Sequence, residues 1–306
     1  MLALVYDPDQ PAGLRLDRVA DPVPGPGEVL VEVRAVSLNH GEVAHRAGRA
    51  KPGAVHGWDA AGVVVVSAAD GSGPPPGTPV VTFGWAGGWA GLRTVSTAEL
   101  AVLPVGLDLG VAAALPVAGV TALRAVRRLG AVLGRRVLVT GAAGGVGRFA
   151  VQLAARAGAD VVASVSTPAR GAGLERLGAT EIVLGPAGVT SPVHGVLDNV
   201  GGAQLADAFV RLEPTGVALA IGNASGEPTI LDFGSVWLEA KGKRIEPFIM
   251  GSGLAEDLAY LVRLLDQGQL DPQIGWRGPW EQAAEAAEAL LSRQVAGKAV
   301  LELPAN

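Results

Sequence analysis

The glycine-rich segment 141–147 carries the clearest chemical meaning in the sequence. An apolar run ends at Thr140, and a helix-like stretch begins at Val146. Glycines let a chain turn without a Cβ clash, and the first turn of a helix presents free N–H groups and a positive dipole end to an anion. The order strand, turn, helix, strand predicts binding of a dinucleotide pyrophosphate, with a purely structural turn as the alternative. The residues expected to bind it are Gly141, Ala142, Ala143, Gly144, Gly145, Val146 and Gly147.

The segment after the next strand indicates which dinucleotide is bound. In NAD sites an acidic residue about 20 residues past the glycines accepts a hydrogen bond from the ribose 2′-hydroxyl. Here the apolar run 160–165 is followed by Ser166, Thr167 and Arg170, and the first acidic residue is Glu175. The two hydroxyls can donate hydrogen bonds, and the arginine can pair with a 2′-phosphate. We therefore expect NADP(H); a helix cap followed by a solvated arginine is the alternative.

Composition excludes several kinds of chemistry. The sequence has no cysteine, so thiolate catalysis, disulfides and thiolate-bound metals are ruled out within it. The net charge is −5 with no basic cluster, and we expect no nucleic-acid partner. The most apolar stretch, 109–123, is too short for a membrane span, and the first residues lack the features of a signal peptide. A cytoplasmic protein is expected.

The spacing of apolar residues divides the sequence into two kinds of structure. Up to about residue 105, short β-branched runs alternate with glycine and proline, which predicts an all-β region. From residue 109, strand-like and helix-like segments alternate, which predicts βαβ units and a parallel sheet. The fold class is therefore α/β. Helices are expected at 111–129, 146–157, 173–177, 203–212, 254–267 and 280–293.

Six motifs follow one another along the chain. They are Asp21–Val31, Ala35–Asn39, Gly57–Val64, Ala114–Ala122, Gly141–Gly147 and Leu197–Gly202. In this order they resemble the medium-chain dehydrogenase/reductase superfamily, in its zinc-free quinone oxidoreductase-like branch. The resemblance implies a GroES-like β-barrel catalytic domain formed by residues 1–115 and completed by 250–306. Between these parts it implies a Rossmann cofactor domain, a doubly wound parallel sheet, over 116–249.

The resemblance places no metal ligands at the superfamily's zinc positions. Where zinc-dependent members carry Cys, His and a second Cys, this chain has Asn39, Trp58 and Val117. A catalytic zinc needs about three protein ligands and an open position, so we expect no metal. Without a Lewis acid, a conjugated acceptor is easier to reduce than a simple ketone, because its negative charge is spread. Hydride transfer from NADPH to a quinone or another α,β-unsaturated carbonyl compound is expected.

The resemblance also implies which side chains act in catalysis. Asn39 and Thr121 match residues that lie near the nicotinamide and the substrate in zinc-free relatives. Trp58 and Trp89 are candidate apolar walls over a planar acceptor. For each of these residues a purely structural role is the alternative. His40 and His45 are candidate proton donors.

The last expected cofactor contacts follow three later strands. Contacts to the cofactor, in part through the backbone, are expected from Val200, Gly222, Asn223, Phe248, Ile249 and Met250.

Two aspartates close to these motifs, Asp59 and Asp198, are interpreted as residues that support the fold rather than as general bases.

Two other functions stay open from the sequence. An enoyl-thioester reductase of the polyketide type is the first, although neither Tyr6 nor Tyr260 falls in the motif that holds a tyrosine in those relatives. A catalytically silent NADP-binding regulatory protein is the second, because fold does not fix function. By analogy with relatives we expect a homodimer whose other partner is a small-molecule substrate.

Overall fold

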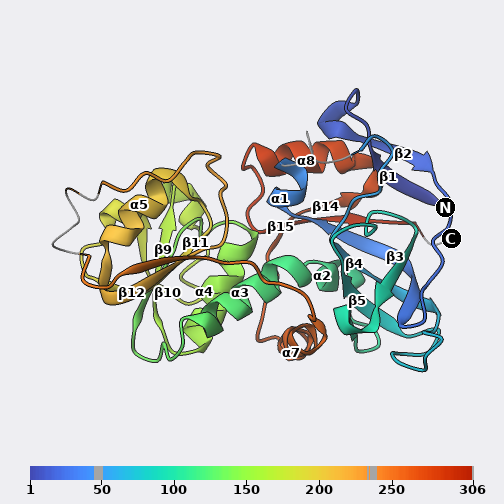
Figure 1. Cartoon of the computed structure of the whole chain (residues 1–306), viewed down its shortest axis with the longest axis horizontal. Coiled ribbons are helices and arrows are strands. Elements are labelled where there is room, and N and C mark those ends of the chain that lie inside the picture. Colours follow the sequence, from blue (N-terminus) through green and yellow to red (C-terminus); the bar gives the residue numbers. More distant parts are fainter. Residues whose placement is uncertain (45–50, 233, 235–239, 305–306) are drawn as a thin grey trace. The chain divides into compact units, whose positions relative to one another are not determined.

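The computed structural model describes residues 1–44, 51–232, 234 and 240–304 (Figure 1). The chain forms two compact units. The first combines Met1–Val120 with Gly251–Asn306, and the second is Thr121–Met250.

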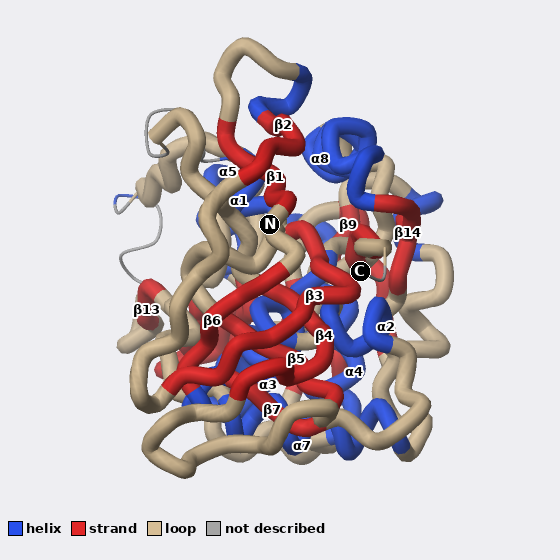
Figure 2. The backbone as a smooth tube through the Cα atoms, turned by 90° about the vertical axis from the view of Figure 1, so that its right-hand side faces the viewer, coloured by secondary structure: helices blue, strands red, loops and turns tan. Residues whose placement is uncertain are grey.

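A seven-stranded sheet is the frame of the first unit (Figure 2). Its order is β14-β15-β3-β4-β5-β7, with β6 paired to the long strand β3. Strand β15, near the end of the sequence, pairs antiparallel with β3, so both parts of the chain build one sheet. The strands are β3 (Glu28–Leu38), β4 (Asp59–Val66), β5 (Pro79–Phe83), β6 (Leu92–Ser96), β7 (Leu100–Val102), β14 (Ile274–Pro279) and β15 (Lys298–Glu302). This is the GroES-like architecture that the motifs predict.

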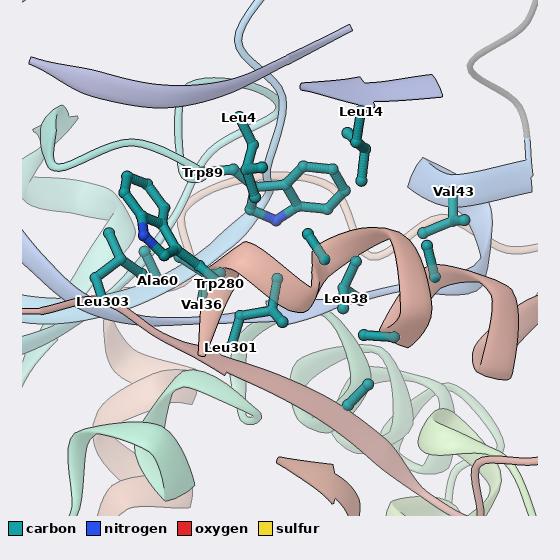
Figure 3. Packing of buried hydrophobic residues seen from close by; sticks show 14 of the residues in the cluster. Leu4, Leu14, Val36, Leu38, Val43, Ala60, Trp89, Trp280, Leu301 and Leu303 are labelled. Carbon is teal, nitrogen blue, oxygen red and sulfur yellow. The ribbon is translucent and has the colours of Figure 1, made fainter. Parts of the chain in front are cut away.

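One core cluster of this unit joins the sheet to the hairpin of β1 (Leu2–Tyr6) and β2 (Leu14–Arg18) and to helix α8 (Ala283–Leu291) (Figure 3). Leu38, Leu301 and Trp280 meet there, and Trp89 is completely buried among them. The other helices of the unit are α1 (His40–Ala44), α2 (Leu109–Ala113) and α7 (Ala255–Asp266).

The second unit is a six-stranded sheet in which every pairing is parallel. Its order, β10-β9-β8-β11-β12-β13, is the doubly wound Rossmann order, which reverses direction between β8 and β11. Buried β-branched runs form the central strands because parallel strands are covered on both faces. The strands are β8 (Arg136–Val139), β9 (Asp160–Val165), β10 (Ala179–Leu184), β11 (Val193–Asp198), β12 (Leu212–Ala220) and β13 (Arg244–Pro247). The predicted α/β fold class is confirmed.

Some of the predicted elements need correction. The helix expected at 111–129 is two helices, because Pro116 starts a new helix, α3 (Pro116–Arg128). The helix expected at 173–177 is wrong: this segment is a series of turns, and Gly173 and Gly178 have φ values of +81° and +108°. The helices expected at 146–157 and 203–212 are α4 (Gly145–Arg156) and α5 (Gly202–Val210). Within the described parts of the chain, no helix is long and apolar enough to cross a membrane.

Candidate functional site

The glycine-rich turn joins β8 to α4 and is shaped by its own backbone. Gly141 has a φ of +58°, and its carbonyl accepts a hydrogen bond of 2.9 Å from the N–H of Gly144. A Cβ on Gly147 would lie 2.3 Å from the carbonyl oxygen of Gly141, so only glycine fits there. The helix therefore starts in close contact with the turn.

Gly144 leaves the start of α4 open to an anion. It caps the helix with a φ of −81° and has no side chain to satisfy the first N–H groups. A Cβ built on it would meet, among the described residues, only the Gly141 carbonyl oxygen within 4 Å, at 3.3 Å. The space that a side chain would fill is thus free beside the first N–H groups of α4. The turn fits a pyrophosphate.

Buried hydrogen bonds hold β8 and β11 together at the point where the sheet order reverses. The Thr140 hydroxyl donates to Oδ1 of Asp198 at 2.6 Å, and the other carboxylate oxygen accepts from the N–H of Gly201 at 2.9 Å. Burial raises the pKa of Asp198 above its usual value. Asn199 donates through Nδ2 to the Thr140 carbonyl at 2.9 Å. Asp198 has the supporting role that the sequence predicts.

Four of the predicted cofactor residues gather around this reversal point. A Cβ on Gly141 would lie 3.1 Å from a methyl group of Val200. A Cβ on Gly201 would lie 2.4 Å from the side-chain oxygen of Asn223, and one on Gly222 would lie 2.9 Å from the carbonyl oxygen of Asn199. The structure therefore brings the ends of β8, β11 and β12 together at the place where nucleotides bind in such sheets.

The residues expected at the 2′-position follow β9. Ser166 and Thr167 are exposed, and Arg170 is half-buried on a short 3₁₀ helix, Pro168–Gly171. Thr167 precedes this helix, but its side chain makes no capping hydrogen bond. The alternative interpretation of this segment as a helix cap therefore lacks the contact that a cap would make. A residue missed in the sequence, the buried Arg148, donates from Nε to the carbonyl of Ala143 at 3.3 Å and from Nη2 to that of Ala172 at 3.1 Å. It ties the glycine-rich turn to the segment that carries Arg170.

The segment 248–250 continues from β13. The N–H of Phe248 donates to the Ala220 carbonyl at 2.9 Å. Met250 is buried and its carbonyl accepts from Arg124, whereas Ile249 is 79% exposed. Ile249 is thus a large apolar side chain placed in solvent.

In the first unit, Asn39 belongs to a buried polar cluster that the sequence analysis missed. We call Asn39, Glu42, Asp59 and Lys298 the polar cluster; all four side chains are buried. Nδ2 of Asn39 donates to Glu42 at 2.8 Å and to Asp59 at 2.9 Å, and Oδ1 accepts from Lys298 at 2.6 Å. Both amide protons are used inside the protein. In this arrangement Asn39 has none left for a substrate carbonyl.

Glu42 is the side chain on which the cluster converges. Oε2 also accepts from the N–H of Asn39 at 2.7 Å, as in a capping box at the start of α1, and Oε1 accepts from the N–H of Trp58 at 2.8 Å. Burial, and next the charge of Asp59, raise the pKa of Glu42 to about 8. The carboxyl group fixes the backbone beside Trp58.

Lys298 and Asp59 link this cluster to the sheet. The lysine Nζ donates to the Leu38 carbonyl at 3.1 Å and lies 3.4 Å from Asp59 Oδ2. Asp59 also accepts from the hydroxyl of Ser37 at 2.8 Å and from the N–H of Val117 at 3.0 Å. Each charge in the cluster has a partner, as buried charges need.

These contacts bring together the three positions where zinc-dependent relatives carry their ligands. Asn39 and Val117 both donate to Asp59, and Trp58 donates to Glu42. An amide already engaged, an indole and a valine do not form a zinc donor set. Within the described residues, no three histidine, cysteine, aspartate or glutamate side chains are grouped to hold a metal ion.

The two tryptophans predicted as walls have different places. Trp89 is completely buried in the core, so its predicted role as an acceptor wall is wrong. Trp58 is half-buried and stands edge to face with Trp85, with ring centroids 5.3 Å apart and planes at 81°. Trp85 was missed in the sequence because it lies in a glycine-rich loop that reads as a turn. Thr121 is 7% exposed on α3 and belongs to the second unit.

Of the candidate proton donors, His40 begins helix α1, and His45 lies outside the described residues.

Comparison with known proteins agrees with this architecture. Residues 25–105 match the family model described as alcohol dehydrogenase GroES-like domain, and residues 176–301 match that of zinc-binding dehydrogenase. The chain is 30% identical to prostaglandin reductase-3 of Bos taurus, over 92% of this chain and 83% of that protein. A quinone oxidoreductase structure from Coxiella burnetii superposes with a TM-score of 0.87 at 27% identity, covering 99% of each chain.

A further relative is much longer than this chain. The chain is 34% identical to a spectinabilin polyketide synthase system protein of Streptomyces orinoci, over 91% of this chain but only 13% of that protein. Together with the fold, these matches show that the chain belongs to the medium-chain dehydrogenase/reductase superfamily, in its zinc-free, quinone oxidoreductase-like branch.

Proposed function

We propose that the protein is a zinc-independent, NADPH-dependent oxidoreductase that reduces quinones or other α,β-unsaturated carbonyl compounds. The observation that carries the proposal is the open glycine-rich turn at the reversal point of the second unit's sheet. A free N-terminal helix end, a glycine cap and the ends of three parallel strands meet there.

The chain's own residues have distinct tasks in this proposal. The N–H groups that follow Gly144 bind the pyrophosphate, and Val200 and Asn223 line the same end of the sheet. Ser166, Thr167 and Arg170 bind a 2′-phosphate, with Arg148 holding their segment against the turn. When bound, NADPH supplies a hydride, so that a quinone and one proton become a hydroquinone and NADP⁺ is left. Trp58 offers an apolar surface to the acceptor.

A second candidate is an enoyl-thioester reductase. The 34% identity to a polyketide synthase system protein favours it, since that match covers 91% of this chain. Reduction of a conjugated thioester needs the same hydride donor but a longer pocket for the acyl carrier. The two functions differ in the acceptor alone.

Nucleotide binding tests the first half of the proposal. Calorimetry with the full chain is expected to give a Kd for NADPH at least about tenfold lower than for NADH, a difference of about 1.4 kcal/mol. Arg170→Ala is expected to remove most of that preference, whereas Arg176→Ala, an exposed neighbour, leaves it unchanged. Equal affinity for the two nucleotides in the wild type would reject the 2′-phosphate assignment.

Gly144→Val tests the turn itself. The position has an ordinary φ and little around it, so the variant is expected to fold while its side chain blocks the anion. Loss of NADPH binding with an unchanged circular dichroism spectrum supports the site. Binding at the wild-type affinity would place the nucleotide elsewhere.

An acceptor panel tests the second half. We expect NADPH oxidation with 1,4-benzoquinone or a simple enone that exceeds oxidation with an enoyl thioester. Faster turnover of the thioester would favour the second candidate. Tight NADPH binding without turnover on any acceptor would favour a regulatory protein.

A further inference from the structure

The loop after β5 presents an unusually exposed aromatic side chain. Trp85 is 54% exposed, and it stands edge to face both with Trp58 and with Phe83, whose ring centroid is 5.0 Å away at an interplanar angle of 81°. Phe83 is almost completely buried, so it anchors the outer ring to the core. We call Trp58 and Trp85 the indole pair.

A buried cation holds the indole pair in place. Arg93 is 2% exposed and donates from Nη1 to the Trp58 carbonyl at 3.0 Å and from Nη2 to the Ala86 carbonyl at 3.3 Å. Burial lowers the pKa of Arg93 to about 10, because the charged guanidinium group is shielded from water. One arginine thus binds the backbone on both sides of the aromatic contact.

Close packing around the loop adds to this rigidity. The N–H of Gly84 donates to the Trp58 carbonyl at 3.0 Å, and a Cβ on Gly84 would lie 2.3 Å from the Arg93 guanidinium. A Cβ on Gly57, just before Trp58, would lie 2.3 Å from the Trp89 ring. The N–H of Trp58 is held by Glu42 of the polar cluster. The protein therefore fixes both backbones before any ligand arrives, and a rigid surface loses little freedom on binding.

The loop also restricts the chemistry of what can bind. Its sequence, Gly-Trp-Ala-Gly-Gly-Trp-Ala-Gly over 84–91, contains no charged side chain. A phosphate-bearing arm or an acidic segment finds no cation there among exposed loop side chains. Electron-rich indole faces instead suit a flat, electron-poor ring, which gains both dispersion and quadrupole attraction on stacking.

We propose that the exposed face of Trp85 is the stacking surface for the acceptor, and that it selects fused-ring quinones over single-ring ones. Trp58, whose ring plane stands at 81° to that of Trp85, bounds this surface at its edge. This inference rests on the proposed function, and it names Trp85 as the residue that determines acceptor specificity. A second fused ring lies over more of the exposed Trp85 indole, so more of the binding free energy of a fused-ring quinone depends on that residue.

The test measures quinone binding separately from turnover. Calorimetric titrations of the full chain with 1,4-naphthoquinone and with 1,4-benzoquinone are made with and without saturating NADP⁺, which cannot reduce them. Because the chain lacks cysteine, no thiol competes for the quinones. Trp85→Ala is expected to raise the Kd for naphthoquinone roughly tenfold and that for benzoquinone roughly twofold.

Matched variants separate stacking from folding. Trp85→Phe keeps a ring and is expected to stay within about threefold of the wild type. Leu133→Ala removes a side chain that is 79% exposed in the second unit and should change neither Kd. In steady-state assays the KM for naphthoquinone should follow the same order, and the NADPH Kd should stay constant.

The possible results distinguish a failure of the stacking surface from a failure of the proposed oxidoreductase function. Equal naphthoquinone affinity in the wild type and in Trp85→Ala overturns the inference, even if the enzyme reduces both quinones. A changed oligomeric state with unchanged quinone binding also overturns it, because the indoles then face a protein. Trp85-dependent binding without NADPH oxidation upholds the stacking surface and overturns the proposed function.

Discussion

The glycine-rich turn and the polar cluster achieve a fixed geometry by opposite means. In the turn, small residues let the backbone approach itself, and the helix start supplies the donors without any charged side chain. In the polar cluster, four buried side chains fix the backbone through hydrogen bonds, and Lys298 and Asp59 carry the charge. The buried Arg93 nearby binds the Trp58 carbonyl. The comparison teaches that the anion site depends on the absence of side chains, whereas the proposed acceptor surface depends on buried charges.

Removing a charge from the polar cluster should give the largest effect. Lys298→Met leaves Asp59 and the Asn39 and Leu38 oxygens without their cation, and breaking such a buried pair costs about 3–5 kcal/mol. Urea unfolding should show this loss of stability. Lys51→Met, at an exposed position, is the matched control and should change stability by less than about 0.5 kcal/mol. Similar results for the two variants would show that the cluster contributes nothing through charge.

A single added carbon should have a smaller but clear effect in the turn. Gly147→Ala places a Cβ 2.3 Å from the Gly141 carbonyl and is expected to cost about 1–3 kcal/mol. In Gly144→Ala, three residues earlier, the Cβ would lie 3.3 Å from the same oxygen, so a much smaller shift accommodates it and the cost should be below about 1 kcal/mol. Thermal unfolding of the pair measures the difference. Equal melting temperatures would mean that the turn yields to the extra atom.

Measured over one pH unit near neutrality, the smallest expected effect is the pH dependence carried by Glu42. Its pKa of about 8 in the folded state lies above the ordinary value of 4.5, so between these values the folded chain holds a proton that the unfolded chain releases. Stability contributed by this group is complete below about pH 4.5 and is lost as the pH rises towards 8. Between pH 6 and 7 the loss is on the order of 1 kcal/mol.

Glu42→Gln isolates this titration. The variant lacks a titrating carboxyl, so its unfolding free energy should fall less steeply with pH than that of the wild type, whatever its absolute stability. Glu285→Gln on α8 provides the comparison at an exposed position outside the polar cluster. Identical slopes for the wild type and Glu42→Gln would show that Glu42 is ionised in the fold at neutral pH.

The sequence predicts the second unit well because its information is local. Strands such as Asp160–Val165 are short, buried, valine-rich runs, and glycines mark the turn that follows β8. The failure at 173–177 is also local: apolar spacing resembled a helix, but Gly173 and Gly178 take left-handed φ values. Pro116 likewise divides a segment whose spacing alone reads as one helix.

The polar cluster escaped prediction because its members meet only in the folded chain. Glu42 lies three residues from Asn39 and had a readable signal, the spacing of a capping box. Lys298 is 259 residues from Asn39, and only its position at the start of an apolar strand marks it as unusual. No local pattern shows that a lysine so far along the chain closes this site.

The separation of 259 residues along the sequence between Asn39 and Lys298 sets an order of events during synthesis. Residues 121–250 leave the ribosome as a whole before β15 is made, so the Rossmann sheet can assemble while the ammonium that neutralises Asp59 does not yet exist. The polar cluster can be completed only after Lys298 has been synthesised. Translation therefore allows the sheet of the second unit to form before the polar cluster of the first unit is closed.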